Sequence, residues 1–404
     1  MMTNNDGSAT PVYRPRQGPE TADIIRLYGD DYTQNRRVPF KHLTVMHHIR
    51  HCRTAMMGGH RDRCNQCGFE RNAYNSCGDR HCPKCRTLVK ERWLESRKSE
   101  LLPTGYFHLV FTLPHELNPV IHCNPQALLG NLFGSVNETL QAFAADPQWR
   151  LEGQLGFIGV LHTWSQTLMD HFHLHCLVPA GVLSFDKARW VPSRKKYLFS
   201  AKSLAKQFRK TYIGHLQRLY ENDDLGFYGN TAATGTTDGF ARLIATLRAK
   251  NWIVYAKRPF AGPVQVLDYL GRYTHRVAIS NHRIVSIDND EITFTYKDRS
   301  DDDRTRRMTL SADEFIRRFL LHVLPARFVK IRYFGFLFHR DKRKNIVLIR
   351  VLIDGQAVFA EPVDESAGQI MLRITGIDIH CCPHCSKGQM IVILKIPKGS
   401  HMKK

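Results

Sequence analysis

The spacing of hydrophobic positions changes several times along the chain, which predicts a mixture of helices and strands. Apolar residues recur at helical spacing from Phe40 through HLTVMHHIRHCRT, and again over residues 124–145 in NPQALLGNLFGSVNETLQAFAA. Apolar runs of strand length occur in YFHLVFTLP, GFIGVLHTWS, HFHLHCLVPAGVLS and WIVYAKRPF. Strands interleaved with helices of these lengths indicate an α+β fold.

The same pattern divides the chain into five expected segments. Residues 1–37 are polar and lack sustained periodicity apart from a short helix at Thr21–Tyr28, so they are expected to form a flexible arm. The expected segments after it are a cysteine-rich module at 38–100, a main α+β domain at 101–290, a basic C-terminal region at 291–365 and a cysteine-containing tail at 366–404. Residues 397–404 are left out of the interpretation because the GSHM within them matches a common cloning scar.

The charge balance indicates a polyanionic partner. Lys and Arg number 58 against 37 Asp and Glu, a formal net charge of +21. Nucleic acid is the commonest partner for such an excess, and the alternative is a basic but solvated surface. The chain contains no apolar stretch long enough to span a membrane and does not begin like a secretory signal, so we expect a cytoplasmic protein of the bacterial nucleoid when bound to DNA.

The cysteines predict a metal site in a reducing compartment. There are 11, an odd number, and most fall into two short windows with C-x-x-C spacing, which suits zinc better than a disulfide framework. A structural Zn²⁺ is therefore predicted on Cys64, Cys67, Cys82 and Cys85.

Other potential ligands surround this predicted site. A second tetrahedral site could use Cys52, His60, Cys77 and His81, unless His60 is simply a loop residue. The C-terminal cluster of Cys381, Cys382 and Cys385 has too few ligands for a site of its own, so it is either half of a site completed elsewhere or free of metal.

Three histidines alternate with apolar residues in HFHLHC. Strand periodicity places His171, His173 and His175 on one face, where neighbouring imidazoles can jointly bind a divalent ion. The alternative is a strand whose histidines face solvent.

Two tyrosines lie four residues apart in a predicted helix, so their side chains share one face. Gln265 precedes Tyr269 and Tyr273 by one turn, and the ordinary interpretation of such a stripe is a helix core. Nearby cations could lower the pKa of a tyrosine and hold a phosphate; they are Lys257, Arg258, Arg272 and Arg276. A phenolate can attack phosphorus when a metal polarises the phosphate.

Together these motifs resemble the rolling-circle insertion-sequence transposases of the IS91-like family, which are HUH nucleases with two tyrosines. The resemblance rests on GGHRDRCNQCG, YNSCGDRHCPKC, YFHLVFTLP, HFHLHCLVPAG, YLGRYTHRVAISN, FIRRFLLHVLPARFVKIRYFGFL and CPHCSKGQM, and it covers roughly residues 40–390. It implies an antiparallel sheet with His-hydrophobic-His on a central strand facing a helix that bears the tyrosines. Residues 101–290 would form this HUH domain and 38–100 a zinc-binding DNA-recognition module.

The resemblance also implies roles for individual residues. His173 and His175 match the HUH pair that ligates Mg²⁺ or Mn²⁺, and Tyr269 and Tyr273 match the nucleophiles. The third metal ligand stays open: Gln265 is the first candidate from helix geometry, followed by His171 and His162. The family more often has Pro at Phe172 and Tyr-Gly where this chain has Tyr333-Phe334-Gly335.

The implied activity is cleavage of single-stranded or hairpin DNA at element ends through a 5′-phosphotyrosine, followed by strand transfer into target DNA. No phosphate-binding loop for ATP is visible, so a helicase would come from the host. The alternatives are a replication initiator or relaxase with the same chemistry, a non-enzymatic zinc-ribbon DNA-binding protein, and a zinc hydrolase that uses His171, His173 and His175. The oligomeric state is left open.

Overall fold

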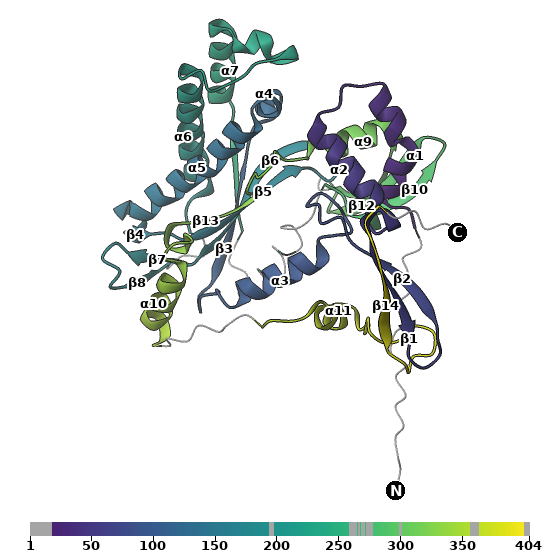
Figure 1. The fold of residues 1–404 in the computed structure, drawn as a ribbon. Coiled ribbons are helices and arrows are strands. Elements are labelled where there is room, and N and C mark those ends of the chain that lie inside the picture. The colour runs from purple at the N-terminus through teal and green to yellow at the C-terminus, as the bar shows by residue number, and fades with distance from the viewer. Residues whose placement is uncertain are drawn as a thin grey trace. The chain divides into compact units, whose positions relative to one another are not determined.

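The chain divides into two compact units, neither of which is continuous in sequence. The computed structural model describes residues 18–193, 198–257, 265, 267, 271, 278–298, 301–355 and 363–399 (Figure 1). The first unit comprises Met1–Glu95, His275–Val323 and Val363–Lys404, and the second comprises Ser96–Thr274 and Leu324–Pro362. The five consecutive segments expected from the sequence therefore differ from the observed division, because distant segments pair and pack together.

A five-stranded antiparallel sheet forms the centre of the second unit. In spatial order its strands are β13 (Ile331–Phe334), β5 (Phe157–Trp164), β6 (Asp170–Pro179), β3 (Tyr106–Thr112) and β9 (Ile253–Lys257). The run HFHLHC lies on β6, which pairs with β5 on one side and β3 on the other. The predicted α+β class and the predicted antiparallel sheet are thus confirmed.

One face of this sheet is apolar and covered by helices. Phe172, Leu174 and Cys176 of β6 are almost fully buried on it. The main covering helices are α5 (Pro125–Ala145) and α6 (Ala201–Glu221), and the unit also contains α4 (Asn118–Cys123) and α7 (Thr237–Ala249) (Figure 1). Phe111 of β3 meets Phe208 of α6 edge to face, with ring centroids 5.2 Å apart.

The hydrophobic pattern did not predict helix α6. Its Leu204, Phe208, Tyr212 and Leu216 are completely buried at helical spacing, while lysines and arginines occupy its outer side. The abundant charges hide the apolar stripe when composition alone is considered.

Smaller elements complete the second unit. They are a three-stranded sheet of β4 (Gly153–Gln154), β7 (Gly181–Ser184) and β8 (Trp190–Pro192), and helix α10 (Lys342–Asp354). Helix α3 (Thr87–Lys98) crosses the boundary between the units.

The first unit joins the N-terminal helices to a later segment of the chain. Helices α1 (Thr21–Gln34) and α2 (Phe40–His51) pack together, and α1 also packs on α9 (Ala312–Leu321). Helix α9 covers a sheet of β10 (Ile284–Asp288), β11 (Glu291–Asp298) and β12 (Arg304–Ser311). Because Ile24 and Ile25 are buried, the part of the expected flexible arm from Thr21 to Gln34 is a packed helix, longer than the short helix predicted at Thr21–Tyr28.

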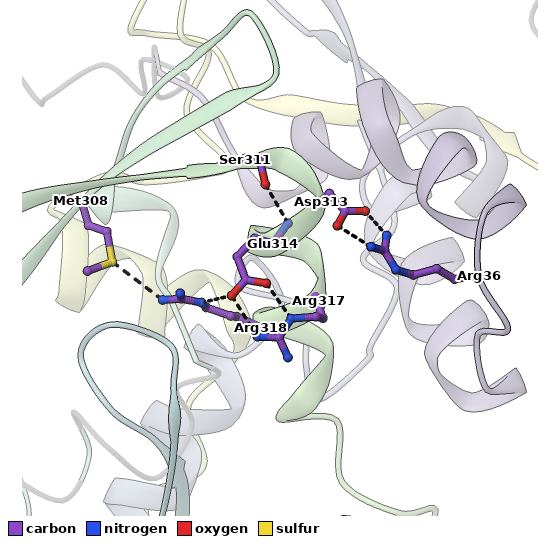
Figure 2. A network of polar contacts seen from close by, with 7 residues as sticks. All are labelled: Arg36, Met308, Ser311, Asp313, Glu314, Arg317 and Arg318. Atoms are coloured by element: carbon purple, nitrogen blue, oxygen red, sulfur yellow. Dashed lines mark hydrogen bonds and ion pairs between the residues drawn. The ribbon is translucent and has the colours of Figure 1, made fainter. Parts of the chain in front are cut away.

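One ion pair joins α9 to the region that follows α1, and two further ion pairs lie within α9. Arg36 forms a two-pronged pair with Asp313, and the Nη2–Oδ2 distance is 2.7 Å (Figure 2). Ser311 caps α9 by accepting the backbone N–H of Glu314, whose carboxylate accepts hydrogen bonds from Arg317 and Arg318. These hydrogen bonds stabilise the carboxylate, the one from Arg317 most strongly, and lower the pKa of Glu314 to about 2.

A second sheet in the first unit brings together the two ends of the described chain. Its order is β14-β1-β2, formed by β14 (Met390–Ile396), β1 (Gly59–Cys64) and β2 (Glu70–Tyr74) (Figure 1). Helix α11 (Ala367–Thr375) precedes β14. The hydrophobic pattern did not predict β14. Within the described parts of the chain, no helix combines the length and apolar character needed to cross a membrane.

Replacing Gly335 tests the close approach between the backbone that follows β13 and the backbone of Leu155. Gly335 has φ +58°, and an added Cβ would lie 1.6 Å from the carbonyl oxygen of Leu155. We expect Gly335→Ala to cost more than about 3 kcal/mol, because a left-handed conformation and a backbone clash add together. The measurement is the urea-unfolding midpoint followed by tryptophan fluorescence.

Gly355→Ala is the matched control. Gly355 ends α10 with φ +75°, but among the described residues nothing lies within 4 Å of an added Cβ. This variant should cost only about 1 kcal/mol from the left-handed conformation. Equal midpoint shifts for the two variants would contradict the proposed clash.

Candidate active site and thiol groups

Three histidines meet on the sheet face opposite α5 and α6. His173 and His175 alternate with the buried apolar residues of β6, so both point to this face. His162 of β5 is paired in register with His173 and therefore shares the face. Residues His162, His173 and His175 are called the histidine group below.

The histidine group is compact and buried. One ring nitrogen from each side chain lies within 4.8 Å of those of the other two. The exposed fractions are 3% for His162, 7% for His173 and 6% for His175. Three buried imidazoles with converging nitrogens, fixed on paired strands, form a typical arrangement for holding one divalent cation.

A backbone hydrogen bond fixes which nitrogen His173 offers. Its Nδ1 lies 2.6 Å from the carbonyl oxygen of His171. Because a carbonyl only accepts, Nδ1 carries the proton and donates it, which leaves the Nε2 lone pair as the ligand atom.

His175 has an equivalent partner in His108 of β3. The His175 Nδ1 lies 2.8 Å from Nε2 of His108, and the two rings stack with their planes 2° apart. His108 is paired in register with Leu177, so it is a diagonal neighbour of His175 on the same face. His108 is only 2% exposed, so a protein side chain and not solvent contacts the Nδ1 side of His175.

The donor set fits a divalent ion. Metal-binding imidazoles typically engage a partner through the second nitrogen. In the histidine group, Nδ1 of His173 does so with a carbonyl, and Nδ1 of His175 lies within hydrogen-bonding distance of His108. Three protein ligands leave coordination positions open for a substrate oxygen. Imidazole is a better ligand for Mn²⁺ than for Mg²⁺, which prefers carboxylate and water oxygens.

The structure describes only some of the other residues predicted for this site. His171 is partly buried, and its ring centroid lies 4.5 Å from that of His173, but it is outside the histidine group. Gln265 is helical and exposed, while only the backbone of Lys257 is described. The predicted residues outside the described part of the chain are Tyr269, Tyr273, Arg258, Arg272 and Arg276.

Sequence reasoning ranked His162 last among the candidate third ligands and did not single out His108. Each is an isolated histidine within an otherwise apolar strand, GVLHTW or YFHLVF. An isolated polar residue in a buried strand is the signal that could have identified them, because burial requires a partner for it.

The first unit contains two groups of four thiols. The N-terminal thiol group consists of Cys52, Cys77, Cys82 and Cys85. Within it, the Sγ of Cys85 lies 3.3 Å from that of Cys52 and 3.5 Å from that of Cys77.

The bridging thiol group consists of Cys64, Cys67, Cys382 and Cys385, from the N- and C-terminal regions of the chain. The Sγ separations are 3.7 Å for Cys64–Cys385 and 3.7 Å for Cys67–Cys382. Backbone N–H groups of Gly388 and Lys387 lower the pKa of Cys385 to about 6, which favours the thiolate form.

Both thiol groups fit zinc. Four sulfurs at Zn–S distances of 2.3 Å occupy the corners of a tetrahedron with edges of about 3.8 Å, close to the observed separations. A disulfide would need about 2.05 Å, and all of these cysteines are free thiols.

The structure divides the thiols differently from the sequence prediction, which joined Cys64 and Cys67 to Cys82 and Cys85. The first pair lies where the β1–β2 hairpin turns, and the second lies beyond its open end, near the C-terminus of α2. Five residue steps of a strand separate these ends by roughly 16 Å, too far for one ion with 2.3 Å bonds. Each pair is therefore completed by other cysteines.

The proposed second set is also divided differently, because His60 and His81 lie outside the thiol groups. His60 approaches Asp62, with a distance of 3.3 Å between Nε2 and Oδ1. His81 and His48 both contact the carboxylate of Asp79, at 3.0 and 2.8 Å. Burial alone would raise the pKa of Asp79, but these hydrogen bonds outweigh it and hold that pKa well below its usual range.

Two family profiles match long regions of the chain. Residues 156–345 match a family profile described as putative transposase, and residues 24–113 match one described as transposase zinc-binding domain. No solved structure matches the chain.

Two relatives extend the similarity over most of the chain. A putative transposase, y4qJ, of Sinorhizobium fredii is 45% identical over 382 residues, which cover 94% of this chain and 96% of the relative. The transposase for insertion sequence element IS801 of Pseudomonas savastanoi pv. phaseolicola is 29% identical over 308 residues, which cover 72% of this chain and 68% of the relative. This chain is therefore a transposase with an N-terminal zinc-binding module, and it belongs to the IS91 family of rolling-circle transposases.

Proposed function

We propose that this transposase cuts single-stranded DNA at an element end through a tyrosine nucleophile and transfers the bound end to a new strand. The observation that carries the proposal is the histidine group, a buried set of three imidazoles on adjacent strands of an antiparallel sheet. The nucleophiles are Tyr269 and Tyr273, which match the two tyrosines of the family motif.

The proposed cleavage is a transesterification that conserves the number of phosphodiester bonds. The phenolate oxygen of one tyrosine attacks the phosphorus, and a P–O bond to tyrosine forms as the bond to the 3′ oxygen breaks. The leaving oxygen takes up a proton and becomes a free 3′-OH, while the 5′ end remains on tyrosine. Attack by another 3′-OH reverses the step and releases the tyrosine, so no ATP is consumed.

In this scheme the histidines would bind the divalent ion. His162, His173 and His175 would present nitrogen atoms to Mn²⁺ or Mg²⁺, and Gln265 remains a further candidate ligand. The bound ion would polarise the scissile phosphate and stabilise the charge that develops on it. The backbone carbonyl of His171 and the ring of His108 keep His173 and His175 oriented.

The proposed DNA contacts follow from charge. The net charge of +21 favours binding along a phosphate backbone. Lys257, Arg258, Arg272 and Arg276 are the proposed phosphate contacts near the tyrosines, and the zinc-binding module is proposed to recognise the single-stranded or hairpin end. Target DNA would enter the same active site, and strand separation would depend on a host helicase.

Replacing both tyrosines tests the nucleophile assignment. With Mn²⁺ and single-stranded DNA carrying the element end, the wild-type chain should form an adduct that survives SDS and is absent with EDTA. The Tyr269→Phe/Tyr273→Phe variant should lose the adduct by at least about a thousandfold, because phenylalanine has no nucleophilic oxygen. A denaturing gel measures the adduct, and a mobility shift measures retained DNA binding.

Tyr228→Phe is the matched control, since Tyr228 is a 70% exposed tyrosine of the second unit. It should form the adduct at the wild-type level. An undiminished adduct in the double tyrosine variant would overturn the assignment.

Replacing His108 tests whether it orients His175. His108→Leu removes the acceptor facing Nδ1 of His175 and should weaken Mn²⁺ binding by about 10- to 100-fold. His108→Gln restores a side-chain acceptor and should recover most of the affinity. Titration of Mn²⁺ monitored by electron paramagnetic resonance gives the affinity without depending on cleavage.

His122→Leu is the control for loss of a histidine in the same unit, because His122 contacts Asp170 and lies outside the histidine group. Its Mn²⁺ affinity should equal that of the wild type. Equal affinities for His108→Leu and wild type would exclude the orienting role.

A further inference from the structure

We propose that the bridging thiol group binds a second zinc ion, which fastens the C-terminal strand β14 to the N-terminal zinc-binding module. The matched family regions end at residues 113 and 345, so neither includes Cys382 or Cys385. The zinc-binding module therefore extends beyond its matched region and is completed by the end of the chain. This inference is independent of the cleavage chemistry proposed above.

The sheet that β14 joins has little apolar burial to hold it. Four consecutive aliphatic residues of β14, Ile391, Val392, Ile393 and Leu394, are between 43% and 54% exposed. The buried cluster at this sheet consists of Cys64, Cys382 and Met390, with Phe69 and Cys385 packed against it. A cluster this small does not stabilise a three-stranded sheet by itself, whereas a structural metal routinely does.

The two C-x-x-C turns are built as a matched pair. In each turn a backbone N–H points at the first sulfur: Gln66 N lies 3.4 Å from Cys64 Sγ, and His384 N lies 3.4 Å from Cys382 Sγ. Such N–H groups stabilise thiolates, the form that binds zinc.

Hydrogen bonds join the two turns to each other. The backbone N–H of Asn65 donates to the carbonyl of Gln389 at 3.0 Å, and the N–H of Gln389 donates to Oδ1 of Asn65 at 2.9 Å. The ring of Phe69 stacks on that of His384 with centroids 5.5 Å apart. These contacts bring the four sulfurs together at tetrahedral spacing.

Gly388 provides the space that the group needs. A Cβ at this position would lie 2.4 Å from the Sγ of Cys64 and 3.0 Å from Oδ1 of Asn65. A side chain here would displace a proposed zinc ligand without removing any thiol, which gives an independent way to disturb the site.

Zinc content of the purified full-length chain is the first measurement. Native mass spectrometry should find two zinc ions per wild-type chain, matching the two thiol groups. Cys382→Ser/Cys385→Ser should retain one zinc, because the N-terminal thiol group is untouched. Cys381→Ser is the matched control and should retain two zinc ions. Cys381 is next to Cys382 in sequence, but among the described residues it is not one of the four thiols of the bridging thiol group.

Hydrogen exchange then tests whether the metal holds β14. In the double serine variant, amides of Met390–Ile396 and of their β1 partners should lose protection, whereas those of β6 should keep it. Gly388→Ala should lose zinc from the same site and expose the same amides with all thiols intact.

Two results would overturn the inference: one zinc in the wild-type chain, or unchanged β14 protection in a variant that has lost the second zinc. Because neither readout involves DNA cleavage, failure here leaves the tyrosine mechanism untouched. Conversely, if the tyrosine mechanism were disproved, the chain would still be expected to bind two zinc ions and to protect the amides of β14 from exchange.

Discussion

The arrangement of the second unit depends on the pairing of β6 with β5 and β3. Strand alternation sends Phe172, Leu174 and Cys176 under the helices and turns His173 and His175 to the opposite face. Apolar burial on one face therefore fixes the orientation of the imidazoles on the other. A slip of one residue would exchange the two sets, exposing the core and burying the histidines beneath α5 and α6, so the fold and the site are stabilised by the same register.

The β14-β1-β2 sheet of the first unit follows a different physical rule, because few of its apolar side chains are buried. Its stability must come from the ladder, from ion pairs and from cross-links. The two thiol groups lie at opposite ends of the β1–β2 hairpin, where bound zinc would restrict both the turn and the open end. Most side chains of this sheet remain at least partly exposed, so its order does not depend on a large apolar core.

Much of the fold could be predicted from local patterns, and the exceptions have identifiable causes. Strands β3, β5, β6 and β9 follow from short apolar runs, and α5 follows from helical periodicity. Helix α6 was not predicted because its lysines and arginines outweigh its apolar stripe in composition. The pairs Cys64/Cys67 and Cys82/Cys85 were recognisable from their spacing, but their grouping was not. Cys64/Cys67 are completed through strand pairing between residues more than 300 positions apart, as the β1–β14 register shows, and Cys82/Cys85 are completed by Cys52 and Cys77. The C-x-x-C spacing indicates that its two cysteines can bind the same ion, but it does not identify the other two ligands of the tetrahedral site.

The histidine group shows the same limit at a finer level. The alternation of HFHLHC places three histidines on one face, yet the third member of the group is His162 of the neighbouring strand and not His171. Register decides this, because His162 lies directly opposite His173. His108 also owes its position to register, since its pairing with Leu177 makes it a diagonal neighbour of His175. A sequence can therefore identify the strand that carries a site, whereas the residues that complete and orient the site are selected by the strands on either side of it.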